Sequence, residues 1–204
     1  MQRELIIACA AAWGGSHLAS APAGASIVDE STLGDFSDDR LAPTTLPLAP
    51  GVTILGGWFG ASAVPDQHDL DYVTFTVPEG HVLSRMGLEE AYVGGAFSFV
   101  GMQAGPVVTI PATWTQIESP LLGWAHFGSA SVGLDLLPDM AASPGSIGFT
   151  APLPAGTYAL WIMELDSSEP YRYAFNLEVT AIPAPASVAA MASVAALGKR
   201  RSRR

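Results

Sequence analysis

Short segments in which apolar and polar residues alternate, separated by glycine and proline, constrain the fold of this chain most strongly. Residues 171–179 carry an aromatic or aliphatic side chain at every second position: Tyr171, Tyr173, Phe175, Leu177 and Val179. A period of two places these side chains on one face of a β-strand. Residues 71–77 alternate similarly and lead into the turn Pro78-Glu79-Gly80. Residues 157–163 follow Pro154-Ala155-Gly156 and are apolar enough for a fully buried strand.

Six weaker strand candidates complete the pattern, and most are separated by turn residues. They are residues 52–55, 82–88, 96–103, 107–110, 123–127 and 146–150. Many short strands, about ten residues apart, favour a β-sandwich over an α/β sheet, because an α/β sheet needs a helix between its parallel strands. We therefore expect an all-β fold, an antiparallel β-sandwich or jelly-roll, over residues 26–180.

Charge is distributed unevenly along the chain. Five of the nine basic residues lie within the last six positions. Between Ser26 and Thr180 there are three basic and eighteen acidic residues, a net charge of −15. A surface this acidic repels nucleic acid, so no nucleic-acid partner is expected.

The N-terminus has the pattern of a signal peptide over residues 1–25. A short charged start precedes the apolar stretch of residues 5–13, and Ala23-Gly24-Ala25 is a small-x-small site at which a signal peptidase would cleave, with Ala23 and Ala25 as the small residues. Ala19-Ser20-Ala21 is an alternative cleavage site, and a helix buried in the fold is the alternative interpretation of the whole segment. The one cysteine, Cys9, lies in this segment, so no disulfide is expected in the mature protein.

The C-terminus, residues 181–204, has three successive parts. Pro183 and Pro185 come first, the apolar residues 186–198 follow, and the basic residues Lys199, Arg200, Arg201, Arg203 and Arg204 end the chain. Thirteen helical residues span roughly 20 Å, which is less than a hydrocarbon core of about 30 Å. We expect a short apolar helix that contacts the inner membrane transiently, with the basic cluster held on the cytoplasmic side. A disordered basic tail is the alternative.

This three-part end resembles the PEP-CTERM sorting signal of Gram-negative bacteria that make extracellular matrix. The central Glu of the family motif is Ala184 here, so that the motif becomes Pro-Ala-Pro. The resemblance implies an exosortase-type processing enzyme as a partner and delivery to the outer cell surface or the extracellular space.

A second resemblance lies within the body of the chain. The segments from Asp69 to Gly80 and from Leu153 to Ile162 resemble a motif pair common in secreted PEP-CTERM proteins. They are also similar, more distantly, to bacterial pre-peptidase C-terminal β-sandwich domains. This similarity implies an accessory module that has no catalytic residues of its own.

Acidic residues are densest around Asp66, Asp69 and Asp71, and Asp35, Asp38 and Asp39 form a second group. Alternate carboxylates in a turn can offer oxygens to a hard cation such as Ca²⁺. If the protein binds a metal, Ca²⁺ at Asp66, Asp69 and Asp71 is the expected site. The glycine and the closing glutamate of an EF-hand are missing, and the alternative is that these residues only solvate a turn.

Trp58 and Trp114 are candidates for sugar binding, because an exposed aromatic face can pack against a pyranose ring. The alternative is that both pack within the fold. A hydrolase site around His126, with Ser129 or Ser131 as nucleophile, lacks a G-x-S-x-G motif.

Together these features predict an exported protein of structural or adhesive type at the cell surface or in the extracellular matrix, and not an enzyme. Extracellular polysaccharide is the expected partner, bridged by divalent cations or bound directly. A carbohydrate-binding module that uses an exposed tryptophan is the main alternative, and a secreted hydrolase is a remote one.

Overall fold

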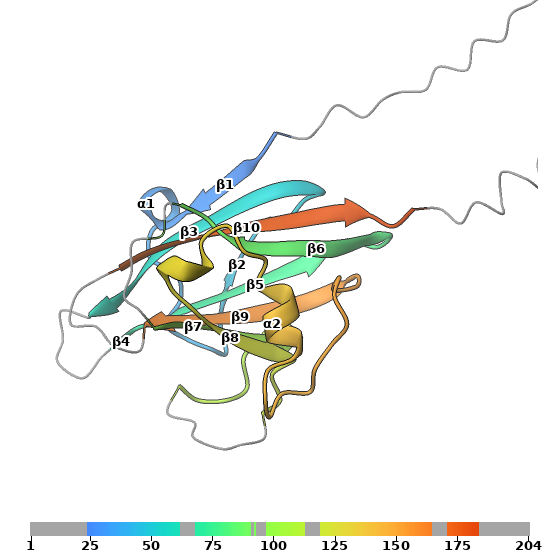
Figure 1. Ribbon diagram of the computed structural model, residues 1–204. Helices are drawn as coiled ribbons and strands as arrows, with labels where there is room; N and C mark the ends of the chain where they lie inside the picture. Colours follow the sequence, from blue (N-terminus) through green and yellow to red (C-terminus); the bar gives the residue numbers. More distant parts are fainter. Residues whose placement is uncertain are drawn as a thin grey trace, which may run out of the picture.

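The computed structural model describes residues 24–61, 68–90, 92, 97–112, 119–164 and 171–183, and it shows two β-sheets packed face to face (Figure 1). The strands are β1 (Ser26–Asp29), β2 (Thr44–Thr45), β3 (Gly51–Ala61), β4 (His68–Asp69), β5 (Asp71–Val77), β6 (His81–Leu88), β7 (Ser98–Ala104), β8 (Gly123–Phe127), β9 (Gly156–Glu164) and β10 (Tyr171–Ala181). The short helices are α1 (Glu30–Leu33), α2 (Leu137–Ala141) and a 3-10 turn at Ser129–Ser131. The expected β-sandwich is therefore confirmed in its broad form.

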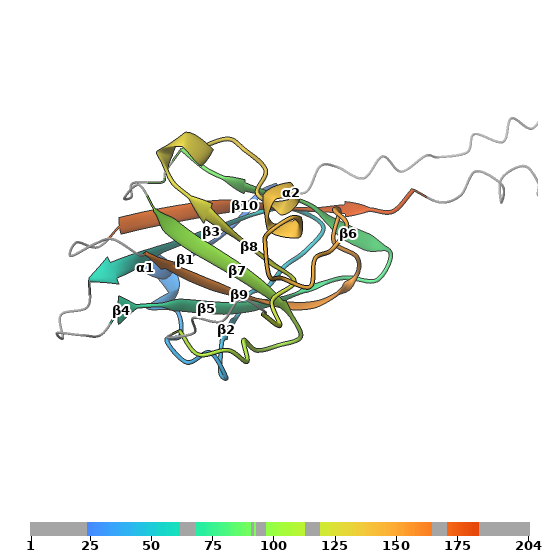
Figure 2. The same ribbon diagram turned by 60° about the horizontal axis from the view of Figure 1, so that its bottom comes forward.

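The first sheet has the order β1-β3-β10-β6, and β4 pairs with the end of β3. The second sheet has the order β2-β5-β9-β7-β8. Helix α2 packs beside β8 at the edge of the second sheet (Figure 2).

The prediction of a wholly antiparallel sandwich of jelly-roll type is wrong in that detail, because both sheets are mixed. Strand β1 pairs with β3 in parallel, and β2 pairs with β5 in parallel. Parallel neighbours need a long connection. The chain provides one by passing from β1 through α1 and β2 before it returns to β3.

Seven predicted strands correspond to β3 and β5 to β10, but two predictions are wrong. Residues 107–110 form no strand: Val108 and Ile110 are buried on the outer face of the second sheet, in one cluster with Tyr72 and Trp161. Residues 146–150 form none either, and Gly148 turns this segment with a φ of 79°.

The main core lies between the sheets and is rich in aromatic rings. Phe59, Phe127, Tyr173 and Phe175 contact one another, with ring centroids 5.1 to 6.2 Å apart. Gly57 makes room for Tyr173, since a Cβ at Gly57 would lie 2.5 Å from the Tyr173 hydroxyl oxygen. The alternation read from residues 171–179 thus provides the inward face of β10.

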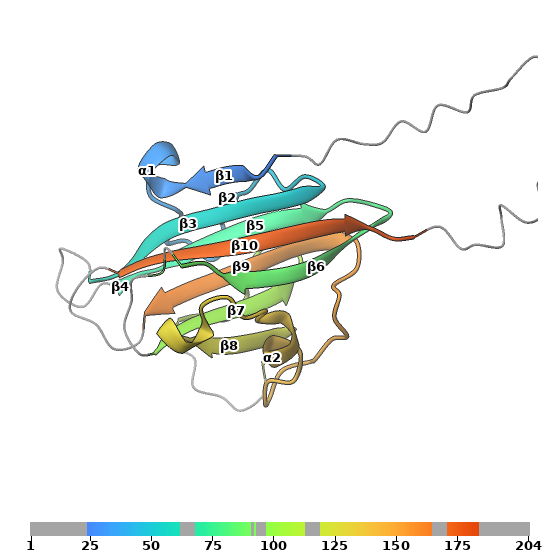
Figure 3. The ribbon, with the colours of Figure 1, turned by 45° about the horizontal axis from the view of Figure 1, so that its top comes forward.

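The first and last described strands leave the sandwich at the same end. Ser26 at the start of β1 pairs with Thr53, and Val179 near the end of β10 pairs with Gly51 (Figure 3). We call the opposite end the distal end. It comprises α1, the last residues of β3, strand β4 and the first residues of β5 and β10.

Most of the expected terminal signals lie outside the described residues. This holds for the signal helix and Ala23, and for the apolar C-terminal helix with Pro185, Lys199, Arg200, Arg201, Arg203 and Arg204. Ala25 and Pro183 are described, and both are exposed. Within the part of the chain that the structure describes, no helix has the length and apolar character needed to cross a membrane.

Candidate functional site

Three carboxyl groups meet at the distal end of the sandwich. Oxygens of Glu30, Asp35 and Asp71 all lie within 4.8 Å of one another. Glu30 begins α1, Asp35 follows that helix, and Asp71 begins β5 in the second sheet. Glu30 and Asp71 are buried, whereas Asp35 is exposed, so the cluster opens to solvent at Asp35.

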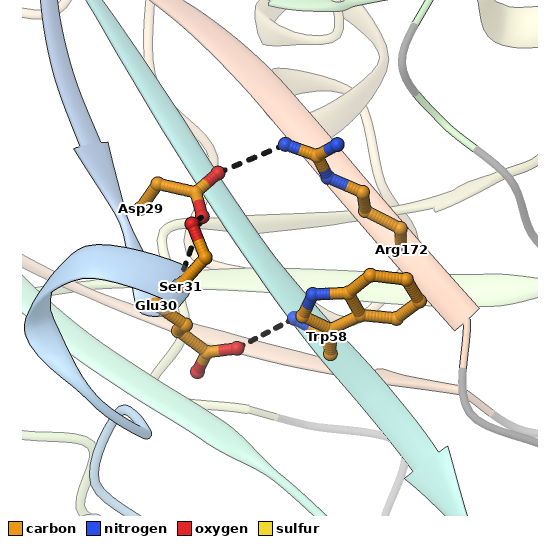
Figure 4. Close-up of polar contacts among 5 residues, drawn as sticks. All are labelled: Asp29, Glu30, Ser31, Trp58 and Arg172. Atoms are coloured by element: carbon orange, nitrogen blue, oxygen red, sulfur yellow. Dashed lines mark hydrogen bonds and ion pairs between the residues drawn. The ribbon is translucent and has the colours of Figure 1, made fainter.

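The local fold of α1 holds Glu30 in place. Asp29 caps the helix by accepting hydrogen bonds from the backbone N–H and the hydroxyl of Ser31. The Glu30 carboxylate then accepts one backbone N–H from Phe36 at 2.8 Å and another from Trp58 at 2.6 Å (Figure 4). Burial raises the pKa of Glu30, and these two hydrogen bonds oppose the rise. Each oxygen keeps a lone pair for a further partner.

Asp71 is the most unusual group of the cluster. Its side chain is 0% exposed, and neither carboxylate oxygen has a hydrogen-bond partner among the described residues. Burial and the nearby charge of Glu30 raise the pKa of Asp71 to about 10. The neighbouring Tyr173 hydroxyl opposes this rise, although it forms no hydrogen bond with the Asp71 carboxylate. A buried carboxylate is costly unless a proton or a cation neutralises it.

Further acidic groups surround the cluster. Burial, together with the charges of Asp35, Glu30 and Asp38, raises the pKa of Asp69 to about 7. Asp38 accepts the backbone N–H of Leu70 at 2.9 Å, which fixes the loop after α1 beside the start of β5. The distal end therefore concentrates negative charge.

An aromatic and charged surface lies beside the cluster, on the outer face of the first sheet. Trp58 is 44% exposed and is the cross-strand neighbour of Arg172. Arg172 forms an ion pair with Asp29 at 3.0 Å (Figure 4). Burial of Asp29 would raise its pKa, but the hydrogen bonds from Ser31 and the contact with Arg172 outweigh burial, and the pKa is lowered.

The structure brings together only part of the predicted metal site. Asp71 and Asp69 lie in or beside the cluster, while Asp66 lies outside the described residues. Asp35, from the second acidic group, joins them across the fold. Glu30 was missed, because an acidic residue in the first turn of a helix is common for electrostatic reasons alone.

The other predicted sites are separate from this cluster. Trp58 is exposed, as the sugar-binding hypothesis requires, and Trp114 lies outside the described residues. The His126 ring stacks on Phe97 with centroids 4.0 Å apart. Ser131 accepts the backbone N–H of Gly128, and neither Ser129 nor Ser131 hydrogen-bonds to His126 within the described part of the chain. The structure therefore assembles no Ser–His pair there.

The atoms of the cluster that could coordinate an ion are all carboxylate oxygens, and hard cations such as Ca²⁺ and Mg²⁺ prefer oxygen ligands. Carboxyl groups this close can also share a proton, as paired acids do in some enzymes. The arrangement thus supports binding of a cation or a proton.

Comparison with known proteins adds no family to this description. No protein-family model matches the chain, and no curated protein is similar enough to count as a relative.

Proposed function

We propose that the protein is exported and acts at the outer cell surface or in the extracellular matrix as a structural or adhesive protein, without catalytic activity of its own. The observation that carries this proposal is that the two ends of the sandwich differ. Both described chain ends lie at one end of the first sheet, and the acidic cluster and Trp58 lie at the other. A molecule attached through its C-terminal segment would present the distal end outward.

The terminal segments support the same proposal. The signal-like residues 1–25 would be removed after Ala25, so that β1 begins at the new N-terminus, Ser26. The PEP-CTERM-like residues 181–204 begin at the last residue of β10 and would engage an exosortase-type enzyme after transient contact with the inner membrane. The accessory role fits the loose similarity to pre-peptidase C-terminal domains.

Expression in a Gram-negative host that has an exosortase, and in a matched strain without it, tests this proposal. We expect surface or matrix protein that starts at Ser26, measured by cell fractionation and mass spectrometry of both termini. A variant with the five basic residues after Gly198 replaced by serine should lose its sorting but keep its N-terminal cleavage. Recovery of the intact chain, from Met1 to Arg204, in the cytoplasm of the exosortase-containing host would refute the proposal.

Carbohydrate binding through Trp58 is the second candidate. The exposed ring of Trp58 lies beside the Arg172–Asp29 ion pair, and sugar sites combine an aromatic face with a few fixed polar groups. Affinity electrophoresis in gels that contain acidic or neutral polysaccharides would detect binding. We expect Trp58→Ala to abolish retardation. Phe97→Ala, which removes a ring that is 48% exposed and lies just before β7 in the second sheet, serves as the matched control.

A further inference from the structure

Asp71 lacks the partner that a buried carboxylate needs. It is fully enclosed between the sheets, and both of its oxygens are unpaired among the described residues. The groups that act on it electrostatically are Glu30, Asp69 and Tyr173, and all three are acids. Such an environment requires a positive charge from outside the chain or retention of a proton.

We propose that Glu30, Asp35 and Asp71 bind one Ca²⁺ ion at the distal end, between α1 and the second sheet. Carboxylate oxygens lie about 2.4 Å from calcium, so two ligands of one ion are at most about 4.8 Å apart. The oxygens of these three residues meet that limit pair by pair. Mg²⁺ demands near-ideal octahedral geometry and gives up its bound water reluctantly, so a site made of carboxylates from separate parts of the fold suits Ca²⁺ better.

The site is built before the ion arrives. Two backbone N–H groups fix the Glu30 carboxylate by donating one hydrogen bond to each of its oxygens. Each oxygen keeps a second lone pair that can bind an ion. Asp71 is fixed by its place in β5, which pairs with β9. The exposed Asp35 provides both a ligand and a route for the ion, and Asp69 lies near enough to add a further negative charge.

Calcium at this position would join segments that are far apart in the sequence. Glu30 and Asp35 belong to the segment between β1 and β2, and Asp71 belongs to the second sheet. Because the ion binds only where these parts are assembled, it stabilises the folded state relative to the unfolded chain.

Thermal unfolding of the purified full chain tests the site. The protein is first treated with a chelator and then melted in excess chelator, in CaCl₂ or in MgCl₂. Calcium at about 100 times its Kd should raise the Tm by roughly 5 to 10 °C, and magnesium should raise it less. Equilibrium dialysis should give about one bound Ca²⁺ per chain. An identical Tm in chelator and in millimolar calcium, without bound calcium, would overturn the proposal.

Two variants assign the ion to these residues. Asp71→Asn keeps the size of the side chain and removes its charge, so we expect it to fold and to lose the rise in Tm with calcium. Asp35→Asn is a second variant, at an exposed residue, so that the test does not rely on a substitution in the core. We expect the Kd for Ca²⁺ to increase at least tenfold in this variant. Asp139→Asn, an exposed acid on α2, is the matched control and should respond like the natural chain. An undiminished calcium response in Asp71→Asn and Asp35→Asn would place the ion elsewhere and contradict the proposal.

Discussion

At the scale of single residues, the outer face of the second sheet carries a row of rings around His126. His126 stacks on Phe97 at 4.0 Å, and its ring also contacts Phe99 and Trp124 edge-on, at 5.8 and 5.2 Å. Burial lowers the pKa of His126, and an interaction with the Ser98 backbone opposes this only in part. The folded state therefore favours the neutral imidazole.

We expect the His126 ring to titrate below 6.5 in the folded protein, which NMR of the imidazole protons would measure. A base with a lowered pKa binds fewer protons when folded than when unfolded. Its contribution to stability is therefore fully present above the unfolded pKa and is lost as the pH falls from that value through the lower folded pKa. His126→Gln should remove this contribution to the pH dependence of unfolding just below the unfolded pKa. A folded-state pKa at or above 6.5 would contradict the role of burial.

At the scale of elements, glycine allows α2 to pack against β8. A Cβ on Gly123 would lie 2.1 Å from the carbonyl oxygen of Met140 in α2. A backbone atom cannot rotate away as the end of a side chain can, so any larger residue at position 123 must move the helix. The Ser143 hydroxyl, which accepts the backbone N–H of Trp124 at 2.9 Å, then fastens the segment after α2 to the same strand.

We expect Gly123→Ala to destabilise the fold by roughly 1 to 3 kcal/mol, because it overfills a packed contact. Its specific effect is displacement of α2, so amide exchange at Met140 and Ala142 should accelerate. Gly133→Ala is the control: its φ of 81° strains an alanine, but nothing lies within 4 Å of the added Cβ. That variant should cost about 1 kcal/mol and leave α2 protected. Equal exchange at α2 in both variants would show that the close approach at Gly123 does not position the helix.

The elements that could be predicted are those whose pattern is local. The alternation in β5 and β10 and the apolar run in β9 identify strands because each buries a face of its own. Strands β1, β2 and β4 were missed, since segments of two to four residues hold too little alternation to be recognised. Residues 107–110 are apolar for a different reason, because they cover the outer face of a sheet.

The candidate site was predictable only in part for the same reason. Asp69 and Asp71 stand out as neighbours in the sequence, whereas Glu30 and Asp35 join Asp71 through the crossover from β1 to β3. That crossover rests on the parallel pairing of an edge strand, which no local pattern indicates. The tertiary fold therefore decides which carboxyl groups lie near Asp71.

At the scale of the whole molecule, one core holds both sheets together. A single cluster of buried side chains includes Leu55 and Phe175 from the first sheet and Val100 and Leu160 from the second. Neither sheet can lose its partner without exposing this shared surface. We therefore expect the described body to unfold as one cooperative unit.

Leu55→Ala should lower the free energy of unfolding by about 2 to 5 kcal/mol and leave the unfolding transition two-state. Tryptophan fluorescence follows Trp58 in the first sheet and Trp161 in the second, and it should change at the same urea concentration as far-UV circular dichroism. Leu41→Ala, at an exposed leucine, should change stability by less than about 0.5 kcal/mol. Two separate steps in either signal would mean that the body does not unfold as one cooperative unit.

The direction of β10 has a mechanical consequence. This strand runs from Tyr171 at the distal end to Ala181, where the chain leaves the sandwich, and it is paired with β3 on one side and β6 on the other. Its ladder hydrogen bonds lie across the strand. Tension between a ligand at the distal end and a tether beyond Ala181 would pull lengthwise, loading both ladders in shear, so that many bonds would have to break together.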